Sequence, residues 1–138
     1  DRQVVMRQVL GALRSGGLFS FSSHNLAAAK TSAYSLKNLP LSANPIRLLR
    51  SCRYYLKGVL NHLRARADEV HTADYALLTE RATHYRYLNY HVSKALQIEQ
   101  LERAGFTGIE LFDEEGRPTG VQRDDRDRWI HYAARKPA

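Results

Sequence analysis

Two stretches of this chain, far apart in its sequence, each read as a helix that ends in glycine and is followed by an apolar strand. The first spans residues 2–22, with Gly16-Gly17 at the junction, and the second spans residues 94–112, with Gly105 there. Glycine ends a helix readily, because it adopts the left-handed conformation after the last turn without steric cost. Helices that alternate with strands in this way predict a mixed α/β fold.

The first stretch leads into a short polar segment. Apolar side chains recur every three or four positions over 2–15, which predicts a helix with Asp1 as a candidate N-cap. Residues 18–21 predict a strand that is covered on both faces. Residues 22–25, Ser-Ser-His-Asn, are expected to leave that strand at its C-terminal end. Ligands in open α/β sheets bind outside this end, so the segment is a candidate functional site.

Residues 26–92 are interpreted as an insertion that contains one long helix. Asn44 and Pro45 predict the start of the helix, as N-cap and first helical residue. Over 46–66, apolar residues spaced three and four apart form a seam, whereas basic residues fall on a different face. His62 is expected at the surface of this helix. The seam comprises Leu49, Cys52, Leu56, Val59 and Leu63, and the basic face comprises Arg47, Arg50, Lys57 and Arg64.

The rest of the chain is predicted from aromatic and aliphatic runs and from turn residues. Residues 75–78 and 87–92 predict two strands, which could pair as an antiparallel hairpin. Ser93 is expected to cap the helix over 94–104. The C-terminal region is expected to contain strands at 106–112 and 129–134, separated by a polar loop over 113–127.

Composition bears on the compartment and on the partners. With 138 residues and 43% hydrophobic content, the chain is expected to form one domain over 1–138. Cys52 is its only cysteine, which excludes an internal disulfide and favours a cytoplasmic location. No apolar run approaches the ~20 residues of a membrane span, and no membrane is expected as a partner. The net charge of +7 favours acidic partners, or reflects a solvated surface or an offsetting acidic segment elsewhere.

The combined pattern resembles the second half of a class I S-adenosylmethionine-dependent methyltransferase. In that family a helix ending in glycines precedes strand five, and strand seven inserts antiparallel between strands five and six. Residues 18–22, 106–112 and 129–134 resemble strands five, six and seven. Residues 13–17 read L-R-S-G-G where the family often has L-x-P-G-G. The resemblance implies a partial Rossmann-like sheet with a helical insertion over 26–92.

Three strings resemble a subset of these enzymes in which strand five ends in Ser-His-Asn. They are FSSHN at 21–25, YHVSKALQIEQLERAGF at 90–106 and IHYAARKP at 130–137. His91 departs from the subset, which usually has Tyr-Tyr before this helix. The sequence contains neither a GxGxG loop after a strand nor the acidic residue that binds the cofactor ribose. The resemblance therefore implies that the parent protein uses S-adenosylmethionine, and that this chain, which begins at Asp1, is a fragment that is inactive by itself.

The polar segment supplies the candidate catalytic residues. His24 could act as a general base on the methyl acceptor, and Asn25 could bind the same group, with Ser23 as a substrate-binding neighbour. The alternative interpretation is that these side chains cap the helix or turn that follows.

A second group of candidates lies in the insertion. His84, Tyr85 and Tyr90 could form, together with His91, a wall that binds the substrate. The alternative is a half-buried strand pair whose rings face solvent. No metal site is predicted, because the histidines and carboxylates lack a ligand spacing such as HExxH.

Two hypotheses of function follow. In the first, the parent protein transfers a methyl group from S-adenosylmethionine to an unidentified acceptor. In the alternative, the chain is a small basic module that binds nucleic acid in a salt-dependent manner through the basic face of residues 46–66. We also expect self-association, with the seam of that helix as the candidate interface, because a missing half-sheet would leave apolar surface uncovered.

Overall fold

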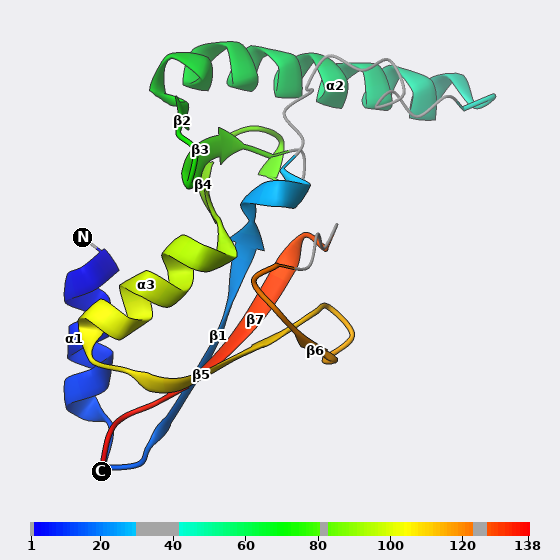
Figure 1. Cartoon of the computed structure of the whole chain (residues 1–138). Coiled ribbons are helices and arrows are strands. Elements are labelled where there is room, and N and C mark those ends of the chain that lie inside the picture. The colour runs from blue at the N-terminus through cyan, green and yellow to red at the C-terminus, as the bar shows by residue number, and fades with distance from the viewer. Residues whose placement is uncertain (1, 30–41, 81–82, 123–126) are drawn as a thin grey trace. The chain divides into compact units, whose positions relative to one another are not determined.

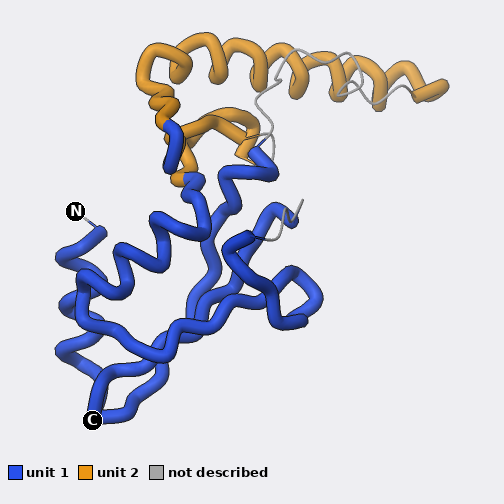
Figure 2. Tube along the Cα trace, viewed as in Figure 1, with its two compact units in different colours: residues 1–29, 73–75, 91–138 blue, residues 30–72, 76–90 orange. Residues whose placement is uncertain are grey.

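The computed structural model describes residues 2–29, 42–80, 83–122 and 127–138, and Asp1 as an N-cap therefore lies outside the described residues. Within them the chain has a mixed α/β fold with three α-helices and seven strands. The chain divides into two compact units (Figure 2). Unit 1 comprises residues 1–29, 73–75 and 91–138, and unit 2 comprises residues 30–72 and 76–90, which lie inside the predicted insertion. None of the described helices is long and apolar enough to cross a membrane.

The sheet of unit 1 is built around its last strand (Figure 1). β7 (Trp129–Arg135) lies between β1 (Leu18–Asn25) and β5 (Thr107–Phe112) and runs antiparallel to both. Tyr132, in the middle of β7, pairs with Phe21 on one side and with Leu111 on the other. The predicted position of the last strand is thus confirmed. The short strand β6 (Pro118–Thr119) pairs with β5, and the end of β4 (Leu88–Val92) pairs in parallel with β1.

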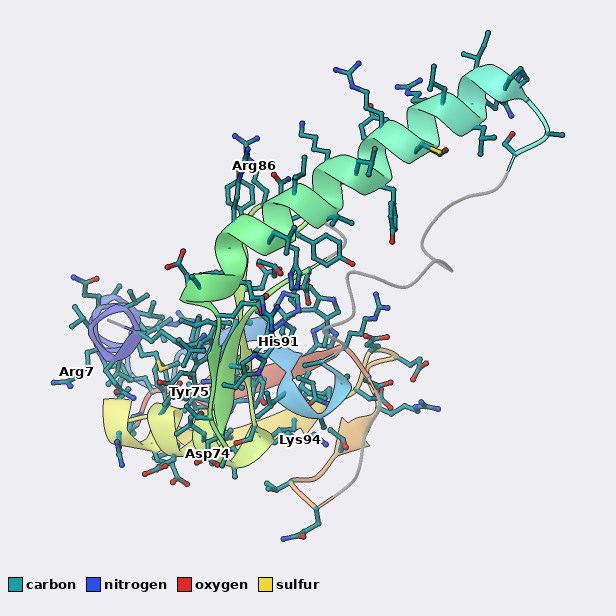
Figure 3. The ribbon with its side chains drawn as sticks, turned by 90° about the horizontal axis from the view of Figure 1, so that it is seen from above. Arg7, Asp74, Tyr75, Arg86, His91 and Lys94 are labelled. Atoms are coloured by element: carbon teal, nitrogen blue, oxygen red, sulfur yellow. The ribbon has the colours of Figure 1, made fainter. Side chains whose placement is uncertain are left out.

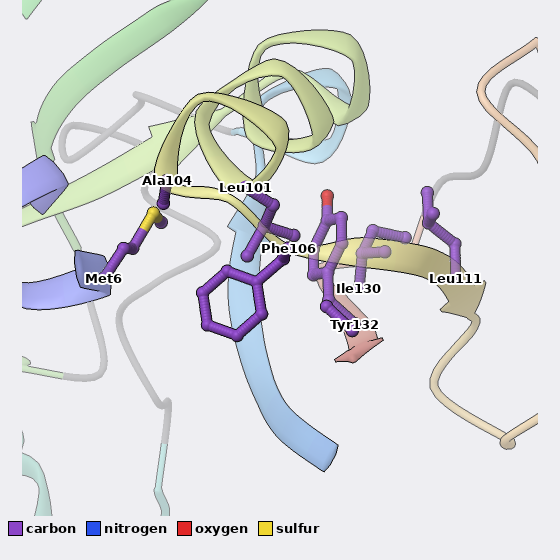
Figure 4. Close-up of a cluster of buried hydrophobic side chains, with 8 residues drawn as sticks. Met6, Leu101, Ala104, Phe106, Leu111, Ile130 and Tyr132 are labelled. Atoms are coloured by element: carbon purple, nitrogen blue, oxygen red, sulfur yellow. The ribbon is translucent and has the colours of Figure 1, made fainter. Parts of the chain in front are cut away.

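Helices α1 (Arg2–Ala12) and α3 (Lys94–Ala104) pack against each other and cover the core of unit 1. The cap residues of α3 are as predicted, because the Ser93 hydroxyl accepts a hydrogen bond from the Leu96 amide and Gly105 has a φ of 103°. The buried cluster of unit 1 contains Met6, Leu101, Ala104, Phe106, Leu111, Ile130, Tyr132 and Ala134 (Figure 4).

The C-terminal end of the chain is bonded to the junction between α1 and β1. The Gly16 amide donates to the Lys136 carbonyl at 3.1 Å, and the Lys136 amide donates to the Gly17 carbonyl at 2.9 Å. The ammonium group of Lys136 also donates to the Leu13 carbonyl at 2.8 Å. Helix α1 ends at Ala12 rather than at residue 15 as predicted, because these bonds hold the chain in a turn after Ala12.

Unit 2 contains helix α2 (Pro45–Ala65), the short 3-10 helix η3 (Arg66–Asp68) and strands of the order β2-β3-β4. β2 (Val70–His71) pairs antiparallel with β3 (Tyr75–Thr79). The side chain of Asn44 accepts hydrogen bonds from the Ile46 and Arg47 amides at 3.0 and 3.2 Å, with proline following it. The predicted start of the long helix is therefore confirmed.

Candidate functional site

Strand β1 continues through the segment that was expected to be a polar exit. It ends at Asn25, because β7 pairs with it as far as His24, which lies opposite Trp129. The Asn25 amide then donates to the Arg128 carbonyl at 2.8 Å. The interpretation of residues 22–25 as an exit loop is therefore wrong. Because strand side chains alternate between faces, Ser22 and His24 share one face, and Ser23 and Asn25 share the other.

The face that carries His24 gathers aromatic and imidazole rings from β1, from β7 and from the end of β4 that belongs to unit 1. The His24 ring lies 3.9 Å from the indole of Trp129 and 4.9 Å from the ring of His91, between centroids. His91 (labelled in Figure 3) is the register partner of His24 on β4 and is 4% exposed. His24 itself is half-buried and Trp129 is 40% exposed, so a ligand can reach these two rings.

A second imidazole lies two residues farther along the same face. The Ser22 hydroxyl is 2.7 Å from Nδ1 of His131, and these two residues are register partners on β1 and β7. A hydroxyl and an imidazole at this distance form a hydrogen bond whose direction depends on the tautomer of the imidazole. We call Ser22, His24, His91, Trp129 and His131 the imidazole face.

Ser23 and Asn25 point to the opposite, buried face of β1, where they are 6% and 3% exposed. The Asn25 side chain donates to the Asp127 carbonyl at 3.0 Å and accepts from the Ala27 amide at 3.1 Å, which caps the 3-10 helix η1 (Leu26–Ala28). Asn25 thus has the capping role that was the alternative interpretation. It fixes the end of β1 and so positions His24.

The candidates of unit 2 occupy different environments. His84 is exposed, and its ring stacks on Tyr54 at 5.7 Å. Tyr85 is only 8% exposed, so little of its surface remains for a substrate. Its ring lies under α2, where a Cβ added to Gly58 would be 3.3 Å from Cδ2 of the tyrosine. Tyr90 is half-buried on β4.

The prediction that His62 lies at the surface of the long helix is wrong. His62 is 5% exposed, and its Nδ1 lies 2.8 Å from the Thr79 hydroxyl. That hydroxyl donates to Oε1 of Glu69 at 2.7 Å, and the Thr79 amide donates to the same oxygen at 3.0 Å. Buried polar groups need such partners, and this His62–Thr79–Glu69 network joins α2 to β3. The helical spacing gave no sign of it, because the partners come from another element.

Three carboxylates gather near the hairpin that follows β5. Asp113, Glu115 and Asp127 each have an oxygen within 4.8 Å of the others. The Asp113 carboxylate already accepts hydrogen bonds from the Glu115 and Arg117 amides at 3.1 and 2.8 Å, and from Nε of Arg117 at 2.8 Å. Burial raises the pKa of Asp113, but these Arg117 bonds and the guanidinium charge outweigh burial and bring the pKa below its usual value. The hydrogen bonds of the turn account for the position of the Asp113 carboxylate.

Comparison with known proteins gives little further information. No family model matches the chain, and no curated protein matches it. One similar solved structure is the crystal structure of a possible exported protein from Bordetella parapertussis, with a TM-score of 0.46 and 21% sequence identity over 99% of this chain. The chain spans 33% of the length of that protein.

Proposed function

We propose that this chain is the C-terminal part of an S-adenosylmethionine-dependent methyltransferase, and that the parent protein methylates an unidentified acceptor in the cytoplasm. The observation that supports it best is the position of β7, which lies antiparallel between β1 and β5. This is the arrangement that the resemblance implied for strands five, seven and six.

The edge of β1 that faces away from β7 also supports the proposal. On that edge, β4 pairs with β1 at His24 and Asn25. Within the described residues, no strand pairs with that edge along Leu18–Ser23. A strand edge in this position can accept a neighbour, and the first half of a methyltransferase sheet would provide one.

In this proposal His24 faces the methyl acceptor at the carboxyl end of β1. S-adenosylmethionine supplies the electrophilic methyl group, and the residues that bind it are expected before Asp1. Methyl transfer needs the acceptor to be held in line and, when the acceptor is protonated, to lose its proton. The imidazole of His24 accepts that proton, and the exposed indole of Trp129 offers a flat surface beside it for the acceptor.

The first experiment compares cofactor binding by this chain with cofactor binding by the parent protein. Calorimetry with S-adenosylmethionine is expected to show no binding to the 138-residue chain and clear binding to the full gene product in which the chain lies. Binding to the short chain, or its absence from the full gene product, would contradict the proposal.

The second experiment tests His24 in the full gene product. Transfer of tritiated methyl from S-adenosylmethionine into a cell extract is expected to fall by roughly 100-fold or more in His24→Gln, the usual contribution of a general base. Cofactor affinity is expected to stay unchanged. The matched control is His71→Gln, because His71 is an exposed histidine of unit 2. Equal activity in the two variants would show that His24 takes no part in methyl transfer.

A further inference from the structure

Helix α2 carries exposed leucines along one side. Leu49, Leu56, Leu60 and Leu63 are 74%, 60%, 53% and 52% exposed. Their spacings of seven, four and three residues place them on one face of a helix. Since the first and last of them are fourteen residues apart, this leucine strip is about 21 Å long at 1.5 Å per residue.

The leucine strip is not the face by which α2 packs within unit 2. That packing face contains Gly58 and His62, which are the buried residues of the helix. Two members of the predicted seam, Cys52 and Val59, lie toward it and are half-buried. The structure thus divides the predicted seam into a packed side and the exposed leucine strip.

Basic side chains adjoin the leucine strip. Arg53, Lys57 and Arg64 are exposed, and each is three or four residues from Leu49 or Leu60, the spacing of neighbours on a helix surface. Between residues 45 and 65 the sequence has no aspartate or glutamate. The side chains that α2 carries along its length are drawn in Figure 3. The exposed surface of α2 therefore combines a cationic band with an apolar strip.

This combination of an apolar strip and a cationic band distinguishes between three candidate partners for the exposed surface of α2. A second copy of α2 would bring a second set of cations against the first, which opposes the self-association expected from the sequence. Nucleic acid would satisfy the cations and leave the leucines in water. An anionic membrane surface satisfies both, because leucines enter the boundary of the acyl chains while arginine and lysine contact the lipid phosphates.

We propose that α2 is an interfacial helix that binds an anionic membrane surface through the leucine strip, with Arg53, Lys57 and Arg64 at the headgroups. This differs from the expectation that no membrane is a partner. That expectation rested on the absence of a membrane span, and a helix that lies in the interface does not need one. The proposal does not depend on methyl transfer.

Co-sedimentation of the chain with lipid vesicles tests the proposal. Binding is expected to vesicles that contain phosphatidylserine and not to vesicles of phosphatidylcholine alone. Leu49→Gln/Leu56→Gln is expected to weaken binding more than tenfold, because two apolar side chains that would be buried in the membrane are lost. Arg53→Gln/Lys57→Gln is expected to weaken it about 25-fold, or about fivefold per cation. Val5→Gln on α1, which replaces an apolar residue that is 57% exposed, is the matched control and is expected to bind like the wild type.

Circular dichroism of each variant tests whether α2 remains helical. It is expected to do so, because all four substituted positions are exposed. Absence of binding to phosphatidylserine vesicles would overturn the proposal. Wild-type binding by the leucine variant would also overturn it, and RNA binding retained by that variant would then assign the cationic band to nucleic acid. A wild-type dimer in light scattering that becomes monomeric in Leu49→Gln/Leu56→Gln would make a second copy the occupant.

Discussion

Replacing Thr79 with valine removes one hydroxyl from the buried network that joins α2 to β3. Valine has nearly the same shape as threonine, so the change leaves no large cavity. The hydroxyl contacts Nδ1 of His62 at 2.8 Å and Oε1 of Glu69 at 2.7 Å, and Thr79 is 2% exposed. In the variant both partners lose a bond in a place where water cannot easily replace it.

The expected cost follows from these two contacts. A hydrogen bond to a charged group contributes about 1.5–3 kcal/mol, and one between neutral groups contributes about 0.5–1.5 kcal/mol. Glu69 keeps its bond from the Thr79 amide, which limits the loss on its side. We therefore expect Thr79→Val to lower the free energy of unfolding of unit 2 by about 2–4 kcal/mol.

Hydrogen exchange measures this effect for each unit separately. Amides of α2 and β3 are expected to exchange roughly 30- to 700-fold faster in the variant, because 1.4 kcal/mol corresponds to tenfold. Thr107→Val is the matched control, since Thr107 lies on an exposed position of β5 in unit 1. It should change stability by less than about 0.5 kcal/mol. Unchanged protection of α2 in Thr79→Val would refute the role of the network.

Three further predictions concern unit 1. Gly105→Ala should lower its unfolding free energy by about 1–2 kcal/mol in urea titrations, because φ is 103° and the new Cβ would lie 3.0 Å from Leu10; an unchanged midpoint would contradict this. Burial raises the pKa of Tyr132, so stability should fall by up to about 1.4 kcal/mol per pH unit above pH ~10, and Tyr132→Phe should remove that part of the slope. Asp113 has a lowered pKa, so Asp113→Asn should be less stable than the wild type at neutral pH, and the difference should shrink below about pH 4; a difference that stays constant in acid would exclude the carboxylate as its source.

The features predicted well from the sequence are those set by neighbouring residues. Asn44 and Ser93 cap their helices because a short polar side chain reaches amides two or three residues ahead. Gly105 ends α3 for an equally local reason. The identities of the three helices and of the five longer strands followed from the spacing and the runs of apolar residues, which depend on a single element. The two-residue strands β2 and β6 were not predicted, and β6 falls in the predicted polar loop.

The features missed from the sequence depend on partners far along the chain. The extension of β1 through Asn25 requires β7 to lie beside it. The register between the two strands cannot be predicted from the sequence of either strand alone. The sequence predicted only that Trp129 lies in a strand. The register between β1 and β7 places its ring against that of His24. The sequence predicted His62 at the surface of its helix, whereas the structure buries it against Thr79 of β3. Long-range pairing therefore determined most of the candidate site.

The pairing of β1 with β7 has a consequence for synthesis on the ribosome. β1 is translated before unit 2, whereas β7 and Lys136, which fix the length of β1 and its junction with α1, are translated after it. Contacts between such distant residues form late and slowly. The residues of unit 2 lie between β1 and β7 in the sequence, so unit 2 is expected to fold before β7 is available to pair with β1. Arrest of translation before residue 129 should therefore leave α2 protected from protease and the imidazole face unformed.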